Sequence, residues 1–398
     1  MIGHDELATE YKQLLNQIYL QKRIVVFTGS DIPILEYIAK QYIDSLEKLG
    51  HSVLTFDKQH FEESMQNLFA YQKEGLDAAI VFNNACFQMR LQSGESLWNV
   101  WKVPCYNILV DHPMYYFDTL DSSPAYGIVA CADKYHTDYI KRFYPTVRNT
   151  IFLPTAGECI KPFQDLKPFA ERTIDVLFIG SYKYHTDIIY DEFDKQLEQE
   201  LLANPSKTFE QAIEDCLSKN QTMLSDSELK TLIEKHRFVD VNTTALFRKK
   251  IIETLVNGGI SVTVYGNGWE SLEIFRHPNF VYKGLISPEN GIALMEDSKI
   301  VLNHMAWFKA GASERIYEAI LQGAISLTDG SEFLHAHLKN MEHIAYYELN
   351  NLDILPQIVT SLLSCPPTIE EMCGKAYQEA LTNHTWQQRV IKLLDTLN

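Results

Sequence analysis

Short runs of β-branched and apolar residues recur along this chain, and most are separated by stretches with helical periodicity. Six such runs in the first 153 residues are candidate strands: Arg23–Thr28, Ser52–Phe56, Ala78–Asn83, Cys105–Val110, Tyr126–Cys131 and Thr150–Leu153. Strands that are buried on both faces show near-continuous apolar runs, because helices cover both sides of a parallel sheet. Segments such as Ile34–Leu49 and Thr137–Phe143 have the pattern of crossover helices. The alternation predicts a doubly wound α/β domain.

The same pattern restarts after Pro154–Arg172, a stretch with three prolines and mixed charges that we interpret as a linker. The second set of candidate strands is Ile174–Ile179, Ile260–Tyr265, Phe280–Tyr282, Lys299–Asn303, Ala324–Thr328 and Ile344–Tyr346. Residues from about 183 to 256 are strongly helical and predict three or four helices inserted near the start of this second domain. Ligands of doubly wound sheets bind outside the carboxyl ends of the strands. We therefore expect two Rossmann-like domains that face each other across a cleft, as in a two-substrate or clamp-like protein.

The charge balance of the chain is acidic. Its 398 residues include 52 Asp and Glu against 35 Lys and Arg, which gives a net charge of −17. General nucleic-acid binders and proteins held on anionic membranes need basic surfaces, so we expect no nucleic-acid partner. A phosphate-bearing small molecule remains compatible with this charge, because a few backbone N–H groups and one or two cations are enough to bind it.

The cysteines and the amino-terminal segment indicate the compartment. Seven scattered cysteines without a C-x-x-C pair argue against a disulfide framework or a zinc site. The start of the chain, MIGHDELATEYKQLL, lacks the basic and apolar regions of a signal peptide. No window approaches the ~18 apolar residues of a membrane span. We expect a reduced, cytoplasmic protein with no transmembrane segment.

The segment that follows the candidate strand Lys299–Asn303 carries the clearest chemistry. A loop with Lys309 precedes a helix whose plausible N-cap is Ser313. Free N–H groups and the positive end of the helix dipole favour a diphosphate there, and Lys309 and Arg315 could add charged contacts. Glu318, one turn further, could accept hydrogen bonds from a ribose diol. The alternative is that Arg315 and Glu318 form an ordinary i,i+3 surface pair.

These residues also resemble a known family. The stretch ERIYEAILQGAISLTD is similar to the carboxyl-domain signature of GT-B glycosyltransferases and, more narrowly, to the spore-maturation-type (CgeB-like) branch. The matching positions of the R-x-x-E-A-x-x-x-G pattern and its flanks are Asn303, Arg315, Glu318, Ala319, Gly323 and Ala324. Further stretches that agree in order are ILVDHPMYY (108–116), IDVLFIGSY (174–182), VTVYGNGWE (262–270) and HPNFVYKGLIS (277–287). The last helical stretch resembles the terminal helix that crosses back to the first domain in GT-B proteins.

The resemblance implies domains at 1–160 for the acceptor and at 161–375 for the nucleotide-sugar, with a terminal helix at 376–398 that packs on the first domain. It implies a hexosyltransferase that moves a sugar from a nucleotide-sugar, with a UDP-sugar favoured, to a glycan or protein acceptor. In that scheme Glu318 binds the ribose, and the helix start with Arg315 or Lys309 binds the diphosphate. The implied donor-site residues are Gly180, Ser181, Tyr265, Gly266, Lys283, Gly284, Leu285, Asn303, Lys309, Ala312, Ser313, Arg315 and Glu318.

No metal cofactor is expected. Fixed N–H groups and a cation can stabilise the charge that develops on the departing diphosphate. The chain also lacks a D-x-D motif placed after a candidate strand.

The catalytic base is sought in the first domain, at the carboxyl end of a strand. Asp111 and His112 follow the fourth candidate strand, and Asp31 follows the first. Asp111 could instead cap the next helix, and His112 could be structural or contact the acceptor. Many retaining GT-B enzymes carry a Glu eight residues before the ribose-binding Glu, and Ala310 stands here, so both stereochemical outcomes stay open.

Two other functions stay in competition with glycosyl transfer. One is another GT-B nucleotide-sugar enzyme, such as an epimerase or hydrolase. The other is a non-catalytic two-lobed protein that binds a sugar or a nucleotide. The sequence leaves the oligomeric state open.

Overall fold

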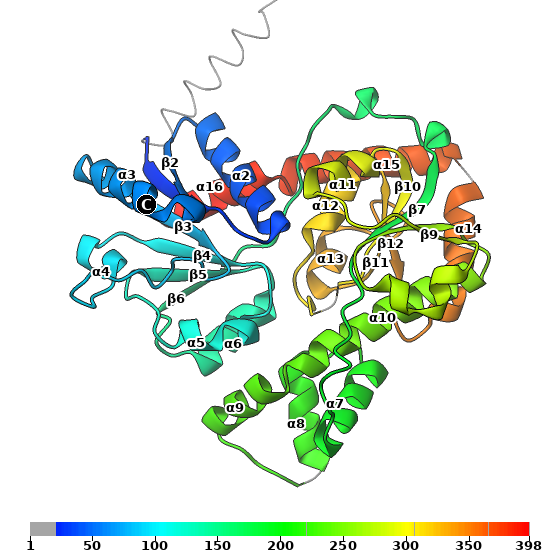
Figure 1. The fold of residues 1–398 in the computed structure, drawn as a ribbon. Helices are drawn as coiled ribbons and strands as arrows, with labels where there is room; N and C mark the ends of the chain where they lie inside the picture. The colour runs from blue at the N-terminus through cyan, green and yellow to red at the C-terminus, as the bar shows by residue number, and fades with distance from the viewer. Residues whose placement is uncertain (1–20, 220, 306, 365, 398) are drawn as a thin grey trace, which may run out of the picture. The chain divides into compact units, whose positions relative to one another are not determined.

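The computed structural model describes residues 21–219, 221–305, 307–364 and 366–397, which form two compact units (Figure 1). The first unit holds the described residues up to Ala132, His136–Leu153 and the segment from Trp386. The second holds Asp133–Tyr135 and Pro154–Thr385. The segment 1–15, for which no signal peptide is predicted, lies outside the described residues.

The first unit is built on a six-stranded parallel sheet in the order β2-β1-β3-β4-β5-β6. Its strands are β1 (Arg23–Thr28), β2 (Ser52–Asp57), β3 (Ala78–Phe82), β4 (Cys105–Leu109), β5 (Gly127–Cys131) and β6 (Asn149–Phe152). All residues of β3 and β4 are buried, as expected of strands covered on both faces. Its helices are α2 (Pro33–Lys48), α3 (Phe61–Lys73), α4 (Leu97–Trp101), α5 (Phe117–Leu120), α6 (Lys134–Phe143) and α16 (Trp386–Leu394).

The second unit has a six-stranded parallel sheet in the order β12-β11-β10-β7-β8-β9. Its strands are β7 (Ile174–Ile179), β8 (Val262–Tyr265), β9 (Phe280–Tyr282), β10 (Ser298–Leu302), β11 (Ile325–Asp329) and β12 (Ala345–Tyr347). The chain runs outward from β7 to β9 and then returns to β10 on the other side of β7. The boundary between β7 and β10 is therefore the switch point, where ligands bind in such sheets.

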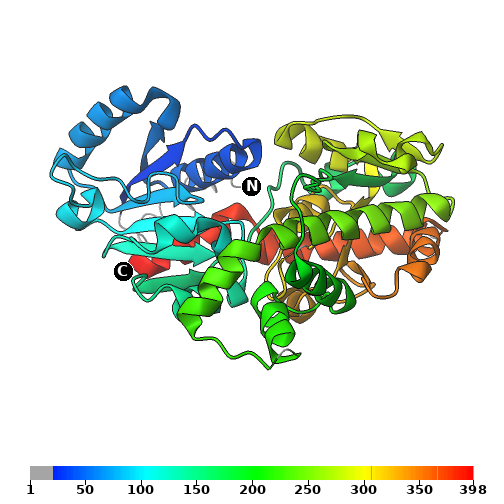
Figure 2. The same ribbon diagram turned by 60° about the horizontal axis from the view of Figure 1, so that its bottom comes forward.

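Four helices separate β7 from β8: α7 (Glu192–Ala203), α8 (Phe209–Lys219), α9 (Asp226–His236) and α10 (Phe238–Asn257). The remaining helices are α11 (Pro288–Met295), α12 (Glu314–Leu321), α13 (Glu332–His337), α14 (Leu355–Ser364) and α15 (Pro366–Asn383). Helix α10 runs along one face of the second sheet, where its apolar residues join those of β7 and β8 in one core (Figure 2).

The predicted fold class is confirmed: two doubly wound α/β domains, the second with a helical insertion. The units divide between Leu153 and Pro154, whereas the predicted boundary follows residue 160. The terminal segment of the first unit begins at Trp386, not at residue 376, because α15 stays in the second unit as far as Asn383. Within the first unit α16 packs on α2, and the rings of Tyr42 and Trp386 lie 6.0 Å apart.

Candidate functional site

The carboxyl ends of four neighbouring strands place predicted donor residues at one edge of the second sheet. Gly180, Gly266 and Asn303 directly follow β7, β8 and β10, and Gly284 is the second residue after β9. Two backbone hydrogen bonds join the loops they belong to. The Gly180 N–H donates to the Tyr265 carbonyl, and the Gly266 N–H donates to the Gly284 carbonyl, both over 2.8 Å. The structure thus brings these residues to the same edge of the sheet, with Gly180 and Asn303 on either side of the switch point.

The close approach of two of these loops requires glycine. Gly266 has a φ of +135°, and a Cβ atom there would lie 2.4 Å from the Gly180 carbonyl oxygen. Gly268 has a φ of +89°, and its Cβ would lie 2.0 Å from the Tyr182 carbonyl oxygen. The Trp269 indole N–H donates to the Gly180 carbonyl over 2.8 Å. The absence of a side chain at Gly266 and Gly268 therefore allows the loop after β8 to pack directly on the loop after β7. The Trp269 side chain adds a hydrogen bond between the same two loops.

The loop after β9 is open. Gly284 has a φ of +76°, and a Cβ atom there would have no neighbour within 4 Å. The Lys283 side chain is exposed, and Leu285 is 68% exposed. An exposed apolar side chain beside an unobstructed backbone can pack against a flat ring. This is compatible with the base-binding role that the resemblance implies for residues 283–285.

Asn303 holds Arg315 at the end of β10. The Arg315 guanidinium donates to Asn303 Oδ1 over 2.7 Å, and Asn303 Nδ2 donates to Thr328 Oγ1 over 2.9 Å. The Tyr347 hydroxyl donates to the Asn303 carbonyl over 2.7 Å, and Asn303 is fully buried. The Asn303 amide is therefore occupied by protein groups, and its role is to position Arg315. Because the Arg315 guanidinium binds Asn303, Arg315 does not form the alternative surface pair with Glu318.

Glu318 is covered by the linker that precedes β7. It is 1% exposed, and its Oε2 accepts a hydrogen bond from the Glu158 N–H over 2.9 Å. A Cβ atom at Gly157 would lie 2.6 Å from the Tyr317 carbonyl carbon, so the linker runs directly over α12. The ribose that the resemblance assigns to Glu318 would reach its carboxylate only after the linker moves away.

Two nitrogen atoms beside Arg315 are buried without a hydrogen-bond partner in the described parts of the chain. They are Nε of Arg248, from α10, and Nδ1 of His304. The Arg248 guanidinium also donates to the Ser181 carbonyl over 2.8 Å. Burial and the neighbouring Arg315 lower the pKa of Arg248 to about 10. Burial and the cations Arg248, Lys309 and Arg315 lower the pKa of His304 well below its ordinary value.

Arg248 and Arg315, with the neutral imidazole of His304 beside them, form a cationic cluster that has the chemistry of an anion site. Arg315 is close enough to Arg248 to contribute to its lowered pKa, and the buried Arg248 Nε–H has no hydrogen-bond partner among the described residues. Arg248 is absent from the predicted site. Nothing in the stretch ALFRKKIIETLV distinguishes it from Lys249 and Lys250, since only the packing of α10 on β7 turns Arg248 inward.

The start of α12 lies in the same loop system. Ser313 has the extended backbone of an N-cap, but its side chain makes no capping hydrogen bond. Its hydroxyl lies 3.2 Å from Glu314 Oε2. The Ala312 carbonyl accepts a hydrogen bond from Thr155 Oγ1 over 2.7 Å. The first N–H groups of α12, which have no intrahelical partner, are therefore not satisfied by Ser313.

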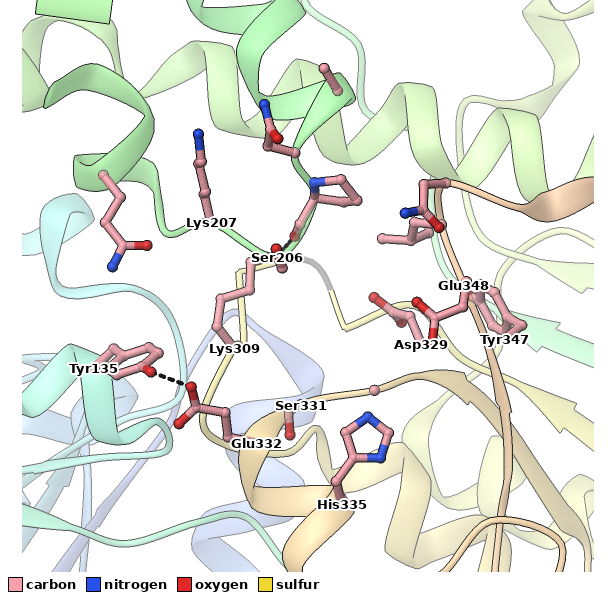
Figure 3. A pocket seen from close by; sticks show the side chains of 17 residues that line it. Tyr135, Ser206, Lys207, Lys309, Asp329, Ser331, Glu332, His335, Tyr347 and Glu348 are labelled. Atoms are coloured by element: carbon pink, nitrogen blue, oxygen red, sulfur yellow. Dashed lines mark hydrogen bonds between the residues drawn. The ribbon is translucent and has the colours of Figure 1, made fainter. Parts of the chain in front are cut away.

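Lys309 points elsewhere than predicted. Its ammonium group donates to the Pro205 carbonyl over 2.7 Å, in the turn between α7 and α8. Burial lowers the pKa of Lys309, and the carboxylates of Asp329, Asp240 and Asp133 oppose this shift. Lys309 lines a cavity of about 610 Å³ between the helical insertion and the ends of β11 and β12 (Figure 3). Lys309 is nevertheless near the cationic cluster, because its positive charge contributes to the lowered pKa of His304.

In the first unit, Asp111 is held by two donors. Its Oδ2 accepts from Asn83 Nδ2 over 2.8 Å and from the Tyr116 hydroxyl over 2.9 Å. Burial and the Asp111 charge raise the pKa of Tyr116 above its ordinary value. The capping role considered for Asp111 belongs to His112, whose Nδ1 accepts from the Met114 N–H over 3.1 Å.

The other candidates in this unit differ in access. His112 is buried, with its ring 4.4 Å from that of His136. Asp31 is exposed and lines a cavity of about 260 Å³ at the ends of β1 and β3. Lys58, Asn83 and Tyr116 line the same cavity. Of the three predicted candidates, Asp31 alone lines this cavity.

One group of side chains in the described residues has the spacing of a metal site: Asp191, Asp194 and His236. Asp191 and Asp194 form the reciprocal capping box of α7, and His236 is hydrogen-bonded to Asp194. These contacts account for the arrangement structurally, and it lies in the helical insertion away from the strand ends. Among the helices that the structure describes, none combines the length and apolar character needed to cross a membrane.

Comparison with known proteins gives a family match over part of the chain. Residues 246–395 match the family described as glycosyl transferase-like. No curated protein sequence matches the chain. The solved structures that resemble it share only about a tenth of its residues, and they indicate the fold.

Three of these structures illustrate the likeness. An α-glucosyltransferase in complex with UDP and a 13-mer DNA is 10% identical, with a TM-score of 0.57 over 95% of this chain and 99% of that one. Sucrose-phosphate synthase from Thermosynechococcus elongatus is 10% identical, with a TM-score of 0.53 over 94% and 98%. HepE from Anabaena, in complex with UDP and glucose, is 11% identical, with a TM-score of 0.50 over 95% and 99%. The chain has the two-domain α/β architecture of these structures, the GT-B fold.

Proposed function

We propose that this protein is a glycosyltransferase that moves a hexosyl group from a UDP-sugar to a glycan or protein acceptor without a metal ion, in the manner of the spore-maturation-type branch. The observation that carries the proposal is the cationic cluster at the switch point of the second sheet. Solved structures with the same fold include complexes with UDP, which supports the choice of nucleotide.

The cationic cluster has the charge and the fixed geometry to stabilise a diphosphate as the leaving group of the transfer reaction. Arg248 is held by the Ser181 carbonyl and Arg315 by Asn303, so both guanidinium groups are in position before a donor arrives. Burial and, second to it, the charge of Arg315 lower the pKa of Arg248, and an anion bound between the two guanidinium groups would offset both effects. Charge grows on the diphosphate as the bond to the sugar breaks, so fixed cations stabilise the transition state more than the bound donor.

The candidate bases of the first unit suit different tasks. Asp111 accepts two hydrogen bonds that stabilise its charged form, and such bonds weaken a carboxylate as a base. Asp31 is exposed and lines the cavity at the ends of β1 and β3. We therefore favour Asp31 as the group that takes the acceptor proton, with Asp111 as the residue that orders Asn83 and Tyr116.

The first experiment measures nucleotide binding by thermal shift and calorimetry with UDP, GDP, TDP and ADP. Wild-type protein is expected to bind UDP, and Arg248→Met should weaken that binding about 10- to 100-fold, as expected for one or two lost charged hydrogen bonds. The control is Lys250→Met, which removes an equal charge from an exposed position on the same helix. Equal UDP binding by both variants would overturn the diphosphate assignment, and Arg315→Met provides a second test if Arg248→Met does not fold.

The second experiment measures turnover. Protein incubated with UDP-sugars should release free UDP, and an acceptor should increase that release. Asp31→Asn is expected to reduce it by more than ~100-fold, and Asp111→Asn by less. Sugar release that no acceptor accelerates would point to a hydrolase, and UDP binding without release would point to a non-catalytic binding protein.

A further inference from the structure

A cavity of about 610 Å³ lies beside Lys309 in the second unit, and none of the cluster residues Arg248, His304 and Arg315 lines it. Its walls come from the α7–α8 turn, from the segments that follow β11 and β12, and from Tyr135. Its volume lies within the range of pockets that enclose small organic ligands. The α7–α8 wall belongs to the helical insertion, so the cavity exists only because the chain inserts helices between β7 and β8.

The wall made by the insertion is braced. Lys207 donates to Glu200 Oε1 over 2.7 Å and is also paired with Asp215. Lys309 donates to the Pro205 carbonyl from the opposite side. These contacts tie the α7–α8 turn to its own helices and to the loop after β10. The cavity is therefore a built feature of the unit.

The charges around the cavity disfavour an anionic ligand. Figure 3 shows Lys207 and Lys309 on one side and Asp329 and Glu348 on the other. Both ammonium groups already bind protein oxygens. The carboxylates of Asp329, Glu348 and Glu332 line the cavity, and a phosphate or carboxylate ligand would meet them. The charge lining this cavity is therefore opposite in sign to that of the cationic cluster.

The remaining polar groups both donate and accept hydrogen bonds. The Gln211 carbonyl oxygen accepts from the Thr208 N–H, which leaves its amide N–H groups to donate. The Asn204 amide donates to Glu200 Oε1, which leaves its carbonyl oxygen to accept. Asn350 and Ser206 also line the cavity, whereas the hydroxyl of Ser331 already donates to the Gly311 carbonyl and accepts from the Leu334 N–H. A metal ion such as Ca²⁺ or Mg²⁺ would need oxygen ligands alone, whereas sugar hydroxyls match a mixture of donors and acceptors.

Tyr135 adds a flat apolar surface to these polar groups. Its hydroxyl donates to Glu332, and this bond fixes the ring at the edge of the cavity (Figure 3). A ring held at its polar end can pack against the apolar face of a pyranose. Polar groups of both kinds, an excess of carboxylates and a fixed aromatic ring together describe a site for a neutral or amino-bearing saccharide.

We propose that this cavity binds an uncharged or amino-bearing oligosaccharide, and that this saccharide is part of a glycan acceptor. The second half of the proposal rests on the proposed function, because only a transferase has an acceptor. The first half stands on the cavity alone. Lys309 links the two sites, since it lines the cavity and belongs to the loop that leads from β10 into α12.

The test uses labelled full-length protein on an array of neutral, amino-bearing, sulfated and sialylated glycans, followed by calorimetry with the strongest soluble hit. Binding of neutral or amino-bearing glycans is expected. Asn350→Ala, Glu348→Gln and the cavity-filling variant Ser206→Trp should each weaken it at least tenfold, whereas Asn351→Ala, a neighbour outside the cavity, should not. UDP binding, measured on the same samples, should stay unchanged in all four.

Each other outcome has one meaning. No glycan bound, binding of acidic glycans only, or glycan binding that survives the three cavity variants would overturn the saccharide site. If glycans bind as expected while UDP does not bind, the cavity assignment stands and the proposed glycosyl transfer fails. Failure of the two proposals is thereby distinguished within one set of measurements.

Discussion

Replacing Asp329 by Asn should stabilise this protein at neutral pH but not in acid. Asp329 ends β11 and is buried, and its Oδ1 accepts a hydrogen bond from the Met305 N–H over 2.7 Å. Burial raises the pKa of Asp329 from 3.8 to about 6, and neither that hydrogen bond nor the nearby Lys309 offsets it fully. The unfavourable free energy of burying the charged carboxylate is therefore larger than the stabilisation that its hydrogen bonds and Lys309 provide.

The sign of the pH dependence follows from this direction. Below pH 3.8 the carboxyl group is protonated in both the folded and the unfolded chain, so it has no cost. Between pH 3.8 and about 6 the folded protein keeps a proton that the unfolded chain has released, and stability falls as the pH rises. Above pH 6 the cost is constant. A pKa difference of this size corresponds to about 3 kcal/mol.

Asn is nearly isosteric with Asp, keeps a carbonyl oxygen for Met305 and carries no charge. Lys309 loses one neighbouring carboxylate but keeps Asp240 and Asp133 nearby, so 3 kcal/mol is an upper bound. At about 2–4 °C for each kcal/mol in a unit of this size, Asp329→Asn should raise the melting temperature by several degrees at pH 7.5.

Scanning calorimetry at pH 4.5, 6.0 and 7.5 measures this, because it can separate the transitions of the two units. The gain should be largest at pH 7.5 and shrink toward pH 4.5. Asp353→Asn, an exposed site in the same unit, is the control and should show no comparable trend. A gain that does not change with pH, or a loss at pH 7.5, would refute the idea that burial of the Asp329 charge is the dominant effect.

Two further pairs of substitutions test the backbone of the site. Gly266→Ala should cost about 2 kcal/mol or more and Gly284→Ala about 1 kcal/mol, because a Cβ at Gly266 meets the Gly180 carbonyl whereas one at Gly284 meets only the strain of a positive φ. Chemical denaturation measures both, and equal costs would mean that the loop contact relaxes freely. Ser287 caps α11 through the Asn290 N–H, whereas the Ser313 side chain caps nothing. Ser287→Ala should therefore cost about 1 kcal/mol and Ser313→Ala clearly less, as thermal melts of the two variants will show.

Most of the fold could be predicted from local patterns. All twelve strands occur within two residues of their predicted ends, because a strand buried on both faces must be apolar along its length. The helical insertion, with four helices, also agrees with prediction. The boundary of the terminal segment was predicted less well, since α15 and the helix after it are both amphipathic and only their packing partners distinguish them.

For the candidate site, too, some features follow from local sequence patterns and others only from the tertiary structure. The sequence by itself determined that Gly180, Gly266, Gly284, Asn303 and Arg315 stand at the ends of parallel strands or just beyond them, because strand ends and helix starts leave local signals. Only the tertiary structure decided which side chains face one another there: Arg248 turned inward from α10, Asn303 holding Arg315, Lys309 drawn to the helical insertion, and Glu318 covered by the linker. Hydrogen bonds and charge effects depend on distance in space, and these partners are separated in the sequence by 12 to 160 residues.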